Sequence, residues 1–146
     1  MKLNIIKFCV VLTALVTPLL SYAAGKPFGV VHDIHGAAYV SDAAEKNVLI
    51  SIGEEIYEGQ TIITSENSEL HITSTDGGLI ALRPETEFRV DVYEAENIPT
   101  DKVHMSLLKG SLRSITGWIP KHNSEAYQVS ALSASIGVRG TYHEIT

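Results

Sequence analysis

The chain has 146 residues, of which 45% are hydrophobic and 19% charged, with a formal net charge of −6 and one cysteine. This length fits one domain, and the apolar fraction is sufficient for a packed core. The acidic balance argues against nucleic-acid binding, which needs clustered lysine and arginine. A single cysteine excludes both an internal disulfide framework and a cysteine-based zinc site.

The first 23 residues are predicted to be a secretory signal peptide. Lys2 and Lys7 form a short positive region, residues 8–16 are an apolar run, and Ser21-Tyr22-Ala23 places small residues at a cleavage site. The apolar run is too short to span a bilayer, and the alternative is an uncleaved N-terminal anchor. After cleavage, residues 24–146 would carry nine basic and 17 acidic residues, a net charge of −8, and no cysteine.

The remaining sequence is predicted to form short β-strands throughout. Apolar and polar residues alternate in segments 70–73, 87–93 and 103–107. Such alternation is typical of strands with one buried face. Phe88, Val90 and Val92 are expected to face the core. Tyr93 is expected on the opposite face, with the charged residues.

Thr75-Asp76-Gly77-Gly78, between two apolar runs, is the strongest turn signal, because Asp76 and Gly77 can take the positive φ of a tight hairpin. Short strands separated by such turns predict an all-β single domain over residues 24–146, arranged either as a β-solenoid-like stack or as a β-sandwich. The strand pattern continues to Thr146, so we expect the natural chain to continue past this residue; the alternative is that this strand is the last edge of the sheet.

Catalytic chemistry has little support in the sequence. There is no Gly-x-Ser-x-Gly elbow and no glycine-rich phosphate loop, and the carboxylate pair Glu54-Glu55 lies at a turn. His32 and His35 are three residues apart, a spacing that places them on opposite faces of a strand. We therefore expect exposed histidines, no metal site, no cofactor and no enzymatic activity.

The sequence has two candidate binding features, a lone tryptophan and free strand edges. Trp118 lies at a strand end or loop, where a lone tryptophan more often caps a core than forms a sugar-binding platform. Free strand edges are the better binding feature, because their unpaired N–H and C=O groups can accept a strand from a partner.

The segment 133–141 contains two glycines on either side of Val138-Arg139. One interpretation is an anion-recognising loop that uses Arg139 and nearby amides. The favoured interpretation is a tight β-arch whose arginine pairs internally with an acidic residue such as Glu144. The predicted structural or binding motif residues are Gly137, Val138, Arg139, Gly140 and Thr141, together with Asp76 and Gly77.

Several short motifs occur in a recognisable order. They are Gly29-Val30-Val31 with Gly36, Gly59-Gln60-Thr61-Ile62-Ile63-Thr64, Thr75-Asp76-Gly77-Gly78, Leu82-Arg83-Pro84-Glu85-Thr86, Leu108-Lys109-Gly110-Ser111-Leu112-Arg113 and Ile136-Gly137-Val138-Arg139-Gly140-Thr141. In combination they resemble the FecR-type domain, over roughly residues 28–146. Members of that family commonly continue past the Arg-Gly-Thr motif, which agrees with the expected truncation.

The resemblance implies an exported all-β domain in a Gram-negative bacterium. The best-known members are inner-membrane sensors with a cytoplasmic anti-sigma segment, one membrane span and this domain in the periplasm, where it contacts the signalling domain of an outer-membrane receptor. This chain lacks the cytoplasmic segment and a true span, and is similar to the stand-alone subgroup that carries a signal peptide. Anti-sigma activity is therefore not carried over.

These observations together predict a non-catalytic periplasmic or secreted protein that acts through protein–protein contact in envelope signalling or sensing. An envelope receptor is the partner that the resemblance implies. The mature chain is expected to have no transmembrane span and no nucleic-acid partner. The alternative is a cell-envelope carbohydrate-binding or surface-associated structural module.

Overall fold

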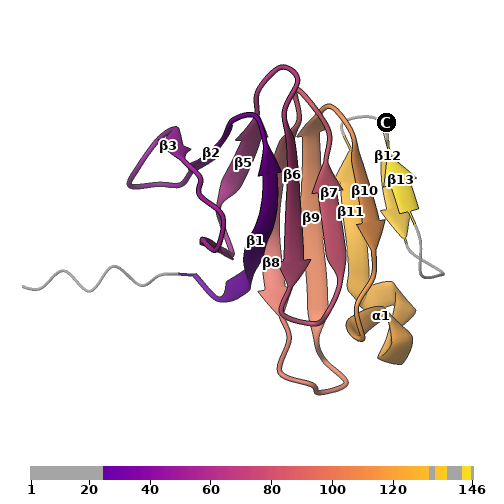
Figure 1. Ribbon diagram of the computed structural model, residues 1–146. Helices are drawn as coiled ribbons and strands as arrows, with labels where there is room; N and C mark the ends of the chain where they lie inside the picture. The colour runs from indigo at the N-terminus through magenta and orange to yellow at the C-terminus, as the bar shows by residue number, and fades with distance from the viewer. Residues whose placement is uncertain (1–24, 132–133, 138–142, 146) are drawn as a thin grey trace, which may run out of the picture.

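Two β-sheets face each other across an apolar interior (Figure 1). The structure is a computed structural model that describes residues 25–131, 134–137 and 143–145. The signal-peptide prediction for residues 1–23 lies outside these ranges. The arrangement confirms the all-β prediction and is a β-sandwich, which decides between the two arrangements left open by the sequence.

One sheet has six strands, all joined by antiparallel pairing. In spatial order they are β13 (His143–Ile145), β10 (Leu112–Ile115), β7 (Leu79–Leu82), β6 (Glu69–Ser74), β1 (Pro27–His35) and β4 (Glu55–Tyr57). Strand β4 is therefore one edge of this sheet, next to the N-terminal strand β1.

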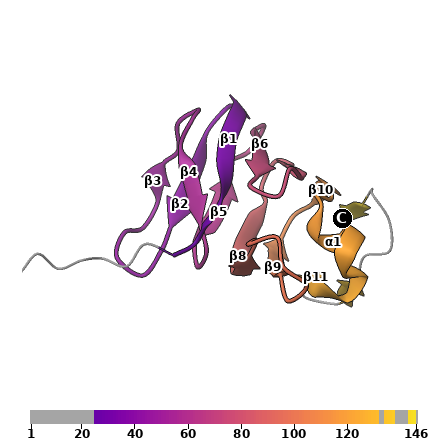
Figure 2. The same ribbon diagram turned by 90° about the horizontal axis from the view of Figure 1, so that it is seen from below.

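The second sheet has seven strands. In spatial order they are β12 (Ala134–Gly137), β11 (Tyr127–Ala131), β9 (Lys102–Lys109), β8 (Glu87–Glu94), β5 (Thr61–Thr64), β2 (Ala38–Ser41) and β3 (Val48–Leu49). The pairing of β9 with β11 is parallel. The connection from β10 of the first sheet to β11 of the second contains a short helix α1 (Ile119–His122) and a 3-10 turn η1 (Ser124–Ala126). Viewed from below, β3 and β4 lie at the same end of the sandwich (Figure 2).

The chain passes from one sheet to the other several times, and the passage between β1 and β2 is a tight turn. Between β1 and β2, Gly36 has φ +80° and Ala37 N–H donates to Ser68 Oγ at 2.9 Å. A Cβ at position 36 would lie 2.3 Å from that same oxygen. Glycine is therefore required at this turn for both its conformation and its lack of a side chain.

The core lies between the sheets and follows the predicted alternation. Leu70 and Ile72 of β6 are fully buried, as are Val103 and Met105 of β9. These side chains alternate with partly exposed neighbours on the outer faces. The predicted one-sided burial of these two strands is confirmed.

The predicted orientation of Tyr93 is wrong. The pairing of β8 with β9 shifts register between Val90 and Val92, which marks a β-bulge. An extra residue in one strand reverses the faces of the residues that follow it. Phe88 and Val90 face the core as expected, but Tyr93 is buried at 2% exposure and Val92 is only half-buried.

Candidate functional site

The hairpin between β6 and β7 is confirmed at the predicted turn. Gly77 N–H donates to Ser74 O at 2.9 Å, and Ser74 N–H donates to Gly78 O at 2.9 Å. Gly77 carries the positive φ, +78°, whereas Asp76 is not among the residues with positive φ. This is a type I turn followed by a glycine bulge, a common three-residue hairpin connection.

Asp76 has a different role, because its side chain points into the protein. Its exposed fraction is 3%, and its Oδ1 accepts hydrogen bonds from Ser74 Oγ at 2.5 Å and from Tyr93 OH at 3.2 Å. The Tyr93 hydroxyl in turn accepts from Asp76 N at 3.0 Å and from Thr75 Oγ1 at 2.8 Å. The hairpin is thereby bonded to β8 of the opposite sheet.

A second buried pair extends this polar cluster. Ser114 Oγ and Tyr127 OH lie 2.7 Å apart in a hydrogen bond between β10 and β11. Burial raises the pKa of Tyr127 to about 12, and the charge of Asp76 contributes to the rise. Burial is also the main cause of the raised pKa of Tyr93. Both hydroxyls therefore stay protonated and serve as hydrogen-bonding groups rather than as bases at neutral pH.

The other carboxylate oxygen of Asp76 is buried without a hydrogen-bond partner. It lies against Gly117, where a Cβ would come within 2.4 Å of Asp76 Oδ2 and 2.2 Å of Asp76 O. The adjacent Trp118 N–H donates to Asp76 O at 3.1 Å. The cluster is thus a closely packed joint between the hairpin and the β10–α1 connection, closed to a substrate.

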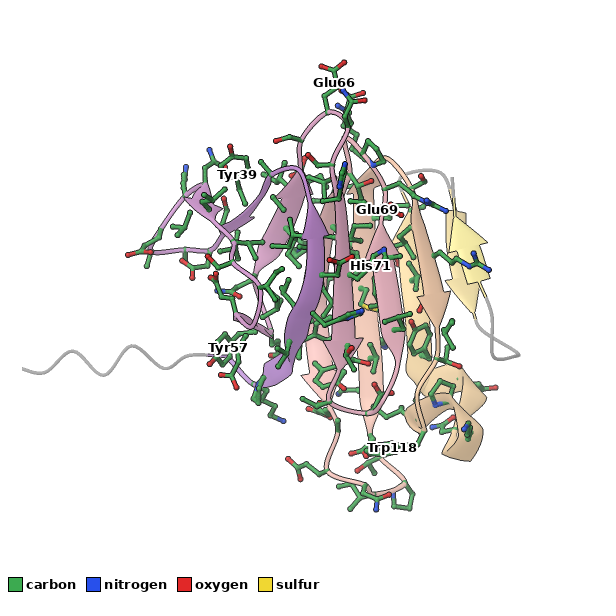
Figure 3. All side chains as sticks on the ribbon, in the orientation of Figure 1. Tyr39, Tyr57, Glu66, Glu69, His71 and Trp118 are labelled. Atoms are coloured by element: carbon green, nitrogen blue, oxygen red, sulfur yellow. The ribbon has the colours of Figure 1, made fainter. Side chains whose placement is uncertain are left out.

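The predicted role of Trp118 as a core cap is confirmed. Its side chain is partly buried and packs against the hydrophobic core. It lies at the same end of the sandwich as α1 (Figure 3). Its position beside the Asp76 hairpin makes it part of the structural joint.

A matching polar joint lies in the two crossovers that contain the Arg83-Pro84-Glu85-Thr86 and Gly110-Ser111 motifs. Thr86 Oγ1 donates to Ser111 O at 3.0 Å and accepts from Ser111 N at 3.1 Å. Thr64 Oγ1 accepts from Thr86 N at 2.9 Å and donates to Arg83 O at 2.7 Å. A Cβ at Gly110 would lie 2.5 Å from Thr86 Oγ1, so the turn requires glycine. These motif residues hold the crossovers together.

The C-terminal motif is described only in part. Gly137 ends β12, where it is paired with Gln128 of β11. Val138, Arg139, Gly140 and Thr141 lie outside the described residues. The β-arch and the internal ion pair of Arg139 stay predictions.

His32 of β1 and His71 of β6 lie on the outer face of the six-stranded sheet, as Figure 3 shows for His71. The rings of His32 and His71 are 5.7 Å apart, His32 Nδ1 is 3.1 Å from Thr73 Oγ1, and His71 lies 3.8 Å from Asp33 and 3.6 Å from Glu69. Within the described ranges, no group of three or more histidine, cysteine or acidic side chains is arranged to hold a metal ion. The arrangement is a polar outer surface.

The most exposed apolar side chains are at the end of the sandwich formed by β3 and β4. Val48 is 39% exposed, Leu49 59% and Ile52 63%. We call residues 48–52 the apolar edge segment. Ile50, between them, is buried, and its N–H donates to Ala38 O at 2.9 Å. The segment is thus anchored at its centre, with its flanking apolar side chains at the surface.

Backbone groups are also available at this edge. Because Ile50 N–H points toward β2, the alternation of a strand turns the N–H and C=O of Leu49 away from β2. Strand β3 is only two residues long and β4 three, which limits uncontrolled edge pairing. No signal in the sequence singled out this segment beyond the general expectation of free edges.

The sandwich, with its internal polar joints and its exposed apolar edge, defines the class of this protein as a small all-β domain. The family model described as "FecR protein" matches residues 60–145, and the chain belongs to this family. The match begins after β4, whereas the sequence motifs predicted a resemblance from about residue 28. No curated protein and no solved structure matches the chain. Within the described ranges, no helix is long and apolar enough to cross a membrane.

Proposed function

We propose that this protein is an exported, non-catalytic member of the FecR family that acts through protein–protein contact in envelope signalling or sensing. Family membership supports the envelope setting, and the signal peptide predicted for residues 1–23 supports export to the periplasm or the exterior. The partner class that the family resemblance implies is an envelope receptor.

The apolar edge segment is the observation that carries the proposal. Leu49 and Ile52 are more exposed than any other large hydrophobic residue that the structure describes. Leu49 lies in the edge strand β3 and Ile52 in the turn that follows it, so a partner can gain apolar contact with both and backbone hydrogen bonds at β3. Ile98, at 45% exposure, is by contrast a single residue in the loop between β8 and β9.

The carbohydrate-binding alternative has less support. Sugar platforms use exposed aromatic faces, and Trp118 is packed against the core instead. A glycan pull-down without any protein partner would nevertheless favour that alternative.

The contact is tested by chemical crosslinking in cells that produce the full chain. We expect a discrete adduct with the wild type, loss of the adduct in Leu49→Lys/Ile52→Lys, and retention in the control Ile98→Lys. Both variants place lysine at exposed positions, so stability is expected to change little. An adduct that persists in the double variant would contradict the proposal.

Export is tested separately by fractionation and mass measurement. We expect the mature form, without residues 1–23, in the periplasm or the medium. A full-length form retained in the membrane would contradict the export step alone.

A further inference from the structure

We propose that the apolar edge segment receives an extended segment of another protein that carries lysine or arginine between apolar residues. This inference rests on the proposed protein-contact function and adds the chemistry of the partner. It also separates this partner from two other occupants, a second copy of the chain and a lipid surface.

Acidic residues flank the apolar edge segment along the chain. Between residues 42 and 58 there is one cation, Lys46. The same stretch has five carboxylates, at Asp42, Glu45, Glu54, Glu55 and Glu58. The exposed apolar side chains are therefore bordered by negative charge on both sides along the chain.

Three of these carboxylates, Glu45, Glu54 and Glu55, form no ion pair with a cation in the part of the chain that the structure describes. The ion pairs there involve other carboxylates, such as Glu69, Glu85 and Glu94. Glu54 accepts a hydrogen bond from Ser51 N, and Glu55 accepts one from the Tyr57 hydroxyl, but these bonds leave the negative charge in place.

This charge selects among the occupants of the edge. Two copies meeting at the same edge would bring like charges together, and an anionic lipid surface would meet the same repulsion. A segment with lysine or arginine gains attraction at its charged positions while its apolar side chains cover Leu49 and Ile52. Electrostatic complementarity of this kind contributes mainly to specificity and association rate.

Two synthetic ten-residue peptides test the proposal with the mature protein. One alternates lysine with valine, and the other has glutamate in place of lysine. Binding is followed by chemical shifts of the backbone amides at low and high salt. The variant Glu45→Lys/Glu55→Lys is compared with the control Glu66→Lys/Glu125→Lys, which makes the same charge change at exposed sites away from the edge.

We expect the lysine peptide to shift amides in residues 45–57 and to lose about tenfold in affinity both at high salt and in Glu45→Lys/Glu55→Lys, with the control variant unchanged. Equal binding of the glutamate peptide, or equal weakening in the control variant, would overturn the proposal. So would self-association that Leu49→Lys abolishes, or binding to vesicles containing phosphatidylglycerol.

The outcomes also separate this inference from the proposed function. If cells yield a protein crosslinked at Leu49 whose captured segment has no lysine or arginine, the charge inference fails and the contact function stands. If no protein is captured at all, the contact function itself fails.

Discussion

Removing the hydroxyl of Tyr93 tests the role of the buried Asp76 cluster. In Tyr93→Phe the aromatic ring keeps its edge contact with Phe28, whose centroid lies 4.9 Å away. The hydroxyl, however, takes part in hydrogen bonds with Asp76 N at 3.0 Å, Asp76 Oδ1 at 3.2 Å and Thr75 Oγ1 at 2.8 Å. The substitution therefore isolates the polar contribution from the packing.

The magnitude follows from which groups are left without a partner. Asp76 N–H loses the acceptor that the structure gives it, and an unsatisfied buried donor costs about 1–3 kcal/mol. Asp76 Oδ1 keeps Ser74 Oγ and loses one of its two donors, a change of about 1 kcal/mol. Thr75 Oγ1 is part-buried and can turn toward water. We expect the free energy of unfolding to fall by about 2–4 kcal/mol.

The assay is equilibrium urea unfolding of the mature protein, with the midpoint shifted and the slope unchanged. The matched control is Tyr57→Phe, which removes a hydroxyl bonded to the exposed Glu55 and is expected to change stability by less than about 0.5 kcal/mol. Equal effects of the two substitutions would refute the assignment of Asp76 as a structural joint.

Four further outcomes follow from the same structure. Gly117→Ala places a Cβ against the buried Asp76 backbone and carboxylate, and we expect a loss of about 1–3 kcal/mol in urea unfolding; no loss would contradict the close packing. Thr86→Val leaves Ser111 N–H without the Thr86 oxygen and should cost about 1–3 kcal/mol, whereas an unchanged midpoint would show that the crossover joint is dispensable. The buried hydroxyls of Tyr93 and Tyr127 have pKa values raised above that of the unfolded chain, to about 12 for Tyr127. Their contribution to the free energy of unfolding is therefore complete below pH 10 and is lost as the pH rises toward 12. An ultraviolet titration in which native Tyr127 loses its proton near pH 10 would contradict this. Arg139→Ala is predicted from the sequence to lower thermal stability with or without a partner, and unchanged stability with lost binding would make Arg139 a contact residue instead.

The sequence predicted the faces of two of the three alternating segments, those that form β6 and β9. Leu70, Ile72, Val103 and Met105 are buried as expected, because strand periodicity alone decides which face they occupy. Tyr93 was assigned to the wrong face, since a β-bulge is a property of the pairing with β9 and leaves no clear signal in one strand.

The candidate site was less predictable than the fold. The turn at Asp76 and Gly77 was found from composition, but the inward orientation of Asp76 depends on Tyr93, which is 17 positions away along the chain. The exposure of Leu49 and Ile52 was missed for a related reason. Apolar residues in short segments look alike in sequence. Leu49 is uncovered because β3 is the last strand of its sheet, and Ile52 because it lies in the turn after β3.

Protein contact through the apolar edge segment is tested most directly by photocrosslinking from single positions in cells that produce the full chain. A photoreactive amino acid is placed at Leu49 or, as the control, at Ile98, both of which are exposed apolar positions. We expect one discrete protein adduct from position 49 and none from position 98. No adduct from position 49, or the same adducts from both positions, would contradict it.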